Sequence, residues 1–269
     1  MRKKICFIVS SPFTAKVFLV NHILRLSEFY DIFLVANFSD FDKSIFNDLP
    51  LKEIKDIAVP RDINLTEDFK ALLNLRSYFK KMQFDAIQTV TPKAGLLGVI
   101  SAKLSGIKVR IHIFTGQVWH TRKGVFKQFL IFLDRFIVWN ATHILIDGES
   151  QRQFLITNGI VKEPNSYVLG KGSISGVDTK RFVPNKHIRL NVRNDLGIRE
   201  NEIVFMFLGR MNHDKGIAEL ATAFNRLQLK YSYIRLLLVG GDEENMTPII
   251  IKKVKNIATV LFYGVTKEP

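Results

Sequence analysis

The stretch Phe205–Leu220, FMFLGRMNHDKGIAEL, decides the fold expected for this sequence. An apolar run that predicts a strand ends at Gly209, and a helical pattern begins at Gly216. Arg210 and Lys215 lie in the polar turn between them. A strand, a cationic turn and a helix can hold an anion between two side-chain cations and the positive end of the helix. We therefore predict a diphosphate clamp that consists of Gly209, Arg210 and Lys215.

The alternative interpretation of Arg210 and Lys215 is that they are solvated surface cations. The chain holds 39 Lys and Arg residues, so two of them in a loop are not distinctive by themselves. The glycines at both ends of the turn favour a binding site.

The composition is that of a globular protein with an anionic partner. Of its 269 residues, 47% are hydrophobic and 24% charged, and the net charge is +14. Such a charge favours nucleic acid, an anionic membrane face or a phosphorylated substrate. Nucleic acid is disfavoured, because the basic residues are scattered and no nucleic-acid-binding motif is present. The single cysteine, Cys6, fits a reducing cytosol and a place in the core.

Short strand patterns alternate with helical patterns along the chain. This order predicts an α/β fold with doubly wound parallel sheets. Strands are expected at Ile5–Val9, Asp31–Ala36, Ile54–Val59, Ala86–Val90, Val109–Phe114, His143–Ile146, Tyr167–Leu169, Ile203–Leu208, Ile234–Val239 and Thr259–Tyr263. Helices are expected at Val17–Leu26, Phe69–Met82, Pro92–Ser105, Val125–Ala141, Ser150–Thr157, Gly216–Lys230 and Thr247–Lys255.

The alternation stops in the stretch Gly170–Pro184, GKGSISGVDTKRFVP. We predict an N-terminal Rossmann-like domain at residues 1–184 and a partial second domain at residues 185–269. The glycine spacing is one residue too long for a dinucleotide fingerprint, and no helix follows, so NAD binding is rejected.

The aromatic-rich segment Val125–Trp139 has two possible interpretations. It is too short and too often interrupted by charge to span a bilayer, which takes about 20 apolar residues. Basic residues, Arg122, Lys123 and Lys127, lie at its start. It is either an interfacial helix on an anionic bilayer or a helix buried against the sheet.

His112 and two acidic residues are further candidates. His112, near the carboxyl end of its strand, is either a hydrogen-bonded core residue or a functional one. Asp40 and Asp42 form a short acidic pattern that we interpret as chance. The six histidines show no metal-ligand spacing, so no metal site is predicted.

Several blocks resemble the GT-B-fold, retaining glycosyltransferases of the large family of bacterial polysaccharide and lipopolysaccharide transferases. The similar subgroup adds an N-acetylhexosamine or a related sugar to an undecaprenyl-diphosphate-linked acceptor. The blocks are TPKAGLLG (Thr91–Gly98), RIHIFTGQVW (Arg110–Trp119), SQRQFLI (Ser150–Ile156), GSISGVDTKRF (Gly172–Phe182) and LGRMNHDKGIAEL (Leu208–Leu220).

The resemblance implies two Rossmann-like domains that face a cleft, with a nucleotide sugar, expected to be UDP-linked, on the C-terminal domain and the acceptor on the N-terminal one. It implies a retaining, metal-independent transfer without a cofactor, in which the departing phosphate helps to deprotonate the acceptor hydroxyl. It also implies work at the cytoplasmic face of the membrane. By this resemblance Arg210 and Lys215 contact the diphosphate, His112 lies near the donor sugar as a catalytic residue, Thr115 and Gly116 line the cleft, and Gly176 and Asp178 belong to the interdomain segment.

The sequence departs from the family pattern in two places. The loop Ser10–Lys16 lacks the family's glycine pair, and Lys16 is expected to supply a phosphate or acceptor contact instead. The family's acidic E-x7-E segment would lie beyond Pro269. We therefore expect a truncated chain with weak or no transferase activity. The alternative is a non-catalytic binding module that holds a lipid-diphosphate acceptor.

Overall fold

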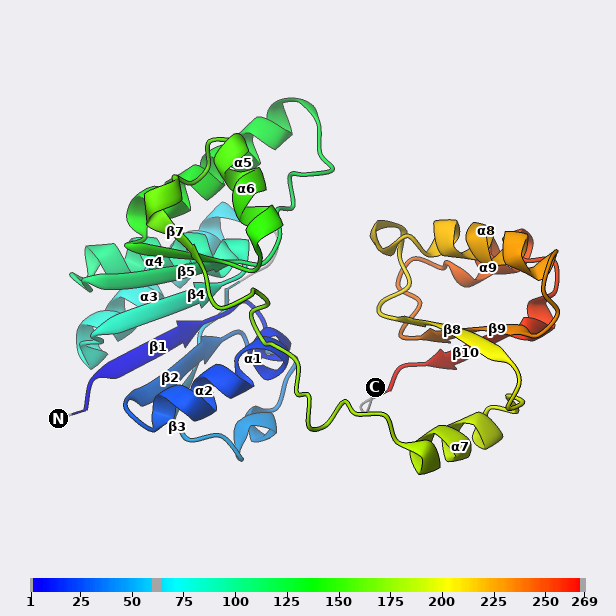
Figure 1. Ribbon diagram of the computed structural model, residues 1–269. Coiled ribbons are helices and arrows are strands. Elements are labelled where there is room, and N and C mark those ends of the chain that lie inside the picture. The colour runs from blue at the N-terminus through cyan, green and yellow to red at the C-terminus, as the bar shows by residue number, and fades with distance from the viewer. Residues whose placement is uncertain (1, 60–63, 267–269) are drawn as a thin grey trace. The chain divides into compact units, whose positions relative to one another are not determined.

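The computed structural model describes residues 2–59 and 64–266, and the chain forms two compact units. The N-terminal unit comprises residues 1–177 and the C-terminal unit residues 178–269. This boundary lies a few residues before the predicted one at 184/185. Met1 and Pro269, the outer ends of the two predicted domains, lie outside the described residues. Each unit is coloured continuously along the chain in Figure 1.

The N-terminal unit is built on a seven-stranded sheet in which every pairing is parallel, as the alternating pattern predicted. The strand order is β3-β2-β1-β4-β5-β6-β7. The strands are β1 (Lys4–Ile8), β2 (Asp31–Ala36), β3 (Leu51–Asp56), β4 (Ala86–Val90), β5 (Val109–Phe114), β6 (His143–Ile146) and β7 (Ser166–Val168).

Helices cover both faces of this sheet (Figure 1). On one face of the sheet, a core cluster joins β1, β2 and β4 to α3, α4 and α5. On the other face, a second cluster joins the alternate strand residues to α1 and α2. A third lies between β5, β6, α5 and α6. The helices are α1 (Pro12–Phe18), α2 (Val20–Ser27), α3 (Leu65–Met82), α4 (Pro92–Leu104), α5 (Gly124–Asn140) and α6 (Glu149–Thr157), with short 3-10 turns η1 (Lys43–Phe46) and η2 (Glu163–Asn165).

Two expectations for this unit were wrong in detail. The helix predicted at Val17–Leu26 is two helices, α1 and α2, and the first begins at Pro12, whose missing N–H costs nothing in a first turn. Strand β3 begins at Leu51, three residues before the predicted start, because Leu51 and Glu53 still pair with β2 across a register shift.

The C-terminal unit holds a three-stranded parallel sheet in the order β10-β9-β8. Helices α8 and α9 pack on the face that carries Phe207, Leu236 and Leu238. The elements are α7 (Lys186–Asp195), β8 (Ile203–Leu208), η3 (His213–Lys215), α8 (Ile217–Gln228), β9 (Ile234–Val239), α9 (Thr247–Lys253), η4 (Ile257–Thr259) and β10 (Val260–Gly264).

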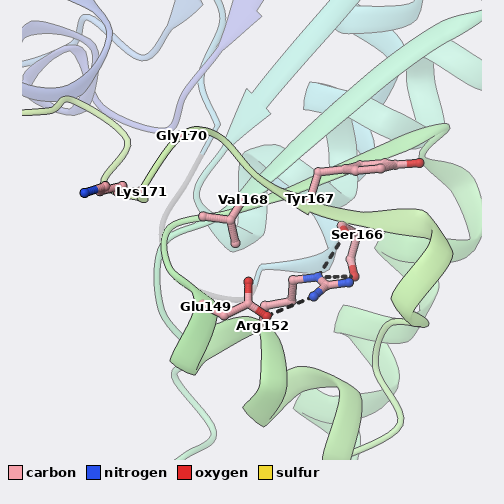
Figure 2. Close-up of a pocket in the computed structure, with 7 residues that line it drawn as sticks. All are labelled: Glu149, Arg152, Ser166, Tyr167, Val168, Gly170 and Lys171. Atoms are coloured by element: carbon pink, nitrogen blue, oxygen red, sulfur yellow. Dashed lines mark hydrogen bonds and ion pairs between the residues drawn. The ribbon is translucent and has the colours of Figure 1, made fainter.

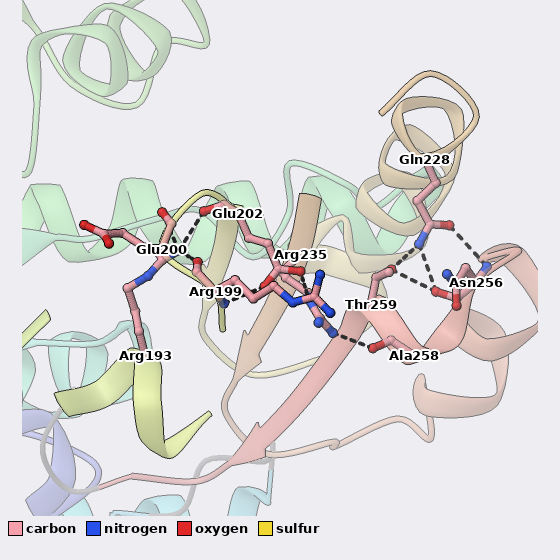
Figure 3. A network of polar contacts seen from close by, with 9 residues as sticks. All are labelled: Arg193, Arg199, Glu200, Glu202, Gln228, Arg235, Asn256, Ala258 and Thr259. Carbon is pink, nitrogen blue, oxygen red and sulfur yellow. Dashed lines mark hydrogen bonds and ion pairs between the residues drawn. The ribbon is translucent and has the colours of Figure 1, made fainter. Parts of the chain in front are cut away.

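A polar network fixes the amino-terminal end of this smaller sheet (Figure 3). The guanidinium of Arg193, on α7, donates to the carbonyl oxygens of Arg199 and Glu202, the latter at 2.7 Å. Arg235, in β9, donates to the Glu202 carboxylate at 2.9 Å and to the Ala258 carbonyl at 2.8 Å. These contacts leave the carboxyl ends of β8 and β9 free to form loops.

Candidate functional site

The loops after β8 and β9 lie against each other through their backbones. The Gly209 amide donates to the Val239 carbonyl at 2.9 Å, and the Met211 amide to the Gly241 carbonyl at 2.8 Å. A Cβ on Gly240 would lie 1.9 Å from the Gly209 carbonyl oxygen. Only glycine at position 240 therefore allows this approach, because a real Cβ would overlap the carbonyl.

Asn212 links the two predicted cations. Its side chain is 6% exposed, and its oxygen accepts the Lys215 amide at 3.2 Å. Its amide nitrogen donates to Glu243 at 3.2 Å, and Glu243 is bound in turn by Arg210. Asn212 thus holds the cationic turn in a defined shape although it carries no charge itself.

Arg210 and Lys215 differ in their surroundings. One terminal nitrogen of Arg210 lies 3.0 and 3.1 Å from the two Glu243 oxygens, while the side chains remain 64% and 43% exposed. Such an exposed ion pair is weak and can exchange partners. Lys215 is exposed, and among the described residues its ammonium group has no hydrogen-bond partner. Both cations are available to an anion.

Lys215 stands at the amino-terminal end of α8. Gly216 takes the left-handed conformation, with φ of 69°, and caps this helix of 12 residues. The strand, turn and helix predicted from the sequence therefore form, and they present two cations beside a helix N-terminus.

Sequence reasoning missed Asn212, Gly240 and Glu243. The signal that could have found Gly240 and Glu243 is their place directly after a predicted strand, where open α/β sheets bind ligands. Asn212 could have been recognised as a capping residue three positions before Lys215.

A second cluster lies at the carboxyl end of β1 and β4, where the strand order reverses direction. The Ser10 and Thr91 hydroxyl oxygens lie 2.9 Å apart, and Ser10 is 7% exposed. Thr91 has a φ of 77°, an outlier for a β-branched residue. Thr115 and Gly116, after the adjacent strand β5, are exposed at the same edge of the sheet.

A buried contact supports the loop that follows Thr115. The Trp119 indole donates to the Asp134 carboxylate at 2.7 Å, and Trp119 stacks on Phe154. Burial raises the pKa of Asp134 to about 6, and the hydrogen bond from Trp119 opposes that rise.

His112 lies in β5 below this edge, and its catalytic role stays a prediction. The side chain is 1% exposed, and Nδ1 lies 2.8 Å from the Thr89 hydroxyl. Helix α4 covers it so closely that a Cβ on Gly95 would lie 2.4 Å from the imidazole ring. Burial lowers the pKa of His112 to about 3. These surroundings keep the imidazole neutral and favour the interpretation of His112 as a hydrogen-bonded core residue.

The remaining predicted site residues lie apart from these clusters. Lys16, on α1, donates to the Ile45 carbonyl at 2.8 Å. Gly176 and Asp178 flank the boundary between the two units, and Asp178 accepts the Lys180 amide at 2.9 Å.

No group of three potential metal ligands occurs within residues 2–59 and 64–266. Asp42 has a structural role, because its carboxylate accepts the amide and hydroxyl of Ser44 at the start of η1. Over the same residues, no helix combines the length and the apolar character that crossing a membrane requires.

A cavity of about 300 Å³ between α6 and β7 does not involve the predicted residues (Figure 2). Arg152 lines it and points at β7, where Nε donates to the Ser166 carbonyl at 3.0 Å. Its other nitrogens bind Glu149 and the Glu163 carbonyl, both at 2.9 Å. Arg152 therefore ties α6 to the edge of the sheet.

Both units match glycosyltransferase domains. Residues 52–168 match the glycosyl transferase 4-like domain, and residues 189–269 match the glycosyl transferases group 1. Together with the two parallel sheets, these matches place the chain among the GT-B glycosyltransferases, as the motif blocks had indicated.

Two curated relatives are glycosyltransferases. The chain is 32% identical over 204 residues to a capsular polysaccharide biosynthesis glycosyltransferase of Staphylococcus aureus, covering 76% of this chain and 51% of the relative. It is 27% identical to UDP-Gal:alpha-D-GlcNAc-diphosphoundecaprenol alpha-1,3-galactosyltransferase of Escherichia coli, over 56% of this chain and 38% of that protein. The chain thus spans about half the length, or less, of these relatives.

Solved structures agree on the fold. An Anabaena protein crystallised with UDP and glucose superposes with a TM-score of 0.73 at 15% identity, covering 99% of this chain and 70% of that one. A glycosyltransferase of Rickettsia africae gives 0.74 at 14% identity, covering 99% and 69%.

Proposed function

We propose that this chain provides the donor and acceptor units of a glycosyltransferase of surface-polysaccharide synthesis. It would move a sugar from a nucleotide-diphosphate donor, UDP-linked, to a saccharide on undecaprenyl diphosphate. The observation that carries this proposal is the β8–α8 turn, which presents Lys215 and the exposed, weakly paired Arg210 near the helix N-terminus.

The turn is suited to a departing diphosphate. Arg210 offers planar N–H donors and Lys215 a mobile point charge. The interaction of both with the leaving phosphate would strengthen as negative charge develops on it. Exposed Arg210 can exchange Glu243 for phosphate oxygens at little cost.

The acceptor would bind at the carboxyl edge of the N-terminal sheet. We assign Thr115 and Gly116 to the cleft, because they are exposed at this edge beside the Ser10 and Thr91 hydroxyls. Lys16 would reach an acceptor phosphate only after leaving the Ile45 carbonyl.

The finer features of the proposal are retention of configuration, independence of metal ions and attachment to the inner face of the cell membrane. The departing phosphate would accept the acceptor's proton in place of an enzyme base. A lipid-linked acceptor would require the enzyme to work at a membrane surface.

Calorimetric titration of UDP tests the donor site. We expect Arg210→Ala and Lys215→Ala each to weaken UDP binding by about tenfold or more, since a charge-assisted hydrogen bond contributes roughly 1.5–3 kcal/mol. Arg226→Ala is the matched control, because it removes a cation from the opposite end of α8. A chelator should leave UDP binding unchanged.

Equal weakening by the Arg226 variant would mean that only net charge attracts UDP. UDP binding without sugar transfer to a lipid-diphosphate acceptor would favour the non-catalytic binding module.

A further inference from the structure

Helix α5 presents an apolar stripe to solvent. Val125, Phe129, Phe132, Phe136 and Trp139 recur at spacings of three or four residues and therefore share one face. Val125, Phe132 and Trp139 are 87%, 58% and 73% exposed. The opposite face packs into the core through Ile131 and Ile137. The helix is thus buried on one side and exposed and apolar on the other, so packing against the sheet accounts for only one of its faces.

The stripe is an ordered surface. The Phe132 and Phe136 rings stack at 6.1 Å, and Phe136 meets Trp139 edge-to-face at 5.8 Å. The Lys103 ammonium, from α4, lies 4.9 Å from the centre of the Trp139 ring. The α5 stripe extends along a helix of about 25 Å in the outer helical layer of the N-terminal unit (Figure 1).

The segment of sequence that contains α5 is strongly basic. Between Ala86 and Ile146 the only acidic residue is Asp134, while eight residues are Lys or Arg. Asp134 is buried and binds Trp119, so it does not reach the surface. Arg122 and Lys123, next to the start of the helix, are exposed, as is Arg135 on its flank.

We propose that the α5 stripe is a docking surface for an anionic lipid bilayer, with the helix lying in the plane of the membrane interface. Aromatic side chains favour the boundary between headgroups and acyl chains, and the basic rim complements anionic headgroups. We favour a bilayer over a protein partner because the aromatic stripe and the adjacent basic residues together match acyl chains and anionic headgroups. The proposal rests on the helix surface and not on sugar transfer.

Sedimentation with vesicles tests the proposal independently of catalysis. Vesicles contain equal parts of phosphatidylglycerol and phosphatidylcholine, or phosphatidylcholine alone. We expect the chain to bind the anionic vesicles, to bind the neutral ones far less, and to be released by salt. Phe132→Gln with Trp139→Gln should weaken binding by about tenfold or more, because the apolar contact is lost.

The matched control is Leu65→Gln with Phe69→Gln. These residues are 81% and 63% exposed at the start of α3, so the pair removes a similar apolar area elsewhere. It should bind anionic vesicles like the unchanged chain. Circular dichroism of both pairs establishes that the helices are retained.

Tryptophan fluorescence locates the contact. Trp119 is 1% exposed and Trp139 is 73% exposed, and the chain has no other tryptophan. Anionic vesicles should therefore shift the emission to shorter wavelength in the unchanged chain, and Trp139→Phe should remove the shift while it retains binding. Equal vesicle binding by the Phe132/Trp139 pair would overturn the proposal. So would a concentration-dependent dimer that this pair dissociates while vesicle binding is unchanged.

Discussion

At the scale of single residues, the burial of His112 bears on the role expected for it. Its place near the end of a strand made it a catalytic candidate, and only packing shows that Gly95 and Thr89 enclose it. The sequence alone could not predict this enclosure, because the approach of α4 to the His112 ring depends on tertiary packing. Cys6, in contrast, was predicted as a core residue and is fully buried.

The free energy of unfolding should depend on pH because His112 is buried and neutral. The pKa of His112 is about 3 in the folded chain and near 6.5 when unfolded. Its contribution to stability is therefore complete above pH 6.5 and is lost as the pH falls toward 3. Between pH 6.5 and 5 we expect a loss of about 2 kcal/mol in the free energy of unfolding.

Denaturant unfolding across this pH range measures the loss, and His112→Gln should show a shallower dependence. If that variant does not fold, proton NMR of the imidazole serves instead. A ring that titrates near pH 6.5 in the folded chain would contradict the assignment.

At the scale of elements, strands were predicted better than helices. Strands β4 and β5 could be located because most of their residues are apolar or β-branched. Helix α7 was missed. Its apolar residues, Ile188, Leu190 and Val192, do not form a helical stripe and remain exposed. Asn185 is nevertheless a residue type that favours the start of a helix. In the structure its side-chain oxygen accepts the amides of His187 and Ile188.

Helix α4 should tolerate no side chain at Gly98, where it approaches β4. A Cβ on Gly98 would lie 2.7 Å from the Thr89 methyl group, so Gly98→Ala should lower the free energy of unfolding by about 1–3 kcal/mol despite alanine's helix propensity. Gly148→Ala is the control, because nothing lies within 4 Å of its Cβ position. Thermal unfolding compares the two, and an unchanged or higher midpoint for Gly98→Ala would contradict this packing.

At the scale of the whole molecule, the sequence predicted two α/β units and the β8–α8 turn. It did not predict that Asn212 and Glu243 organise that turn, since their contacts join loops that are about 30 residues apart. The predicted roles of Arg210 and Lys215 remain a proposal that the geometry supports, as do those of Thr115 and Gly116.

The most direct test of the donor site is to map bound UDP onto the backbone by amide NMR. We predict the largest chemical-shift changes at Gly209, Arg210, Lys215 and Gly216, together with Gly240 in the adjoining loop, and their loss in Arg210→Ala with Lys215→Ala. Shift changes that avoid the β8–α8 turn, or that survive in this double variant, would contradict the assignment of the turn as the diphosphate site.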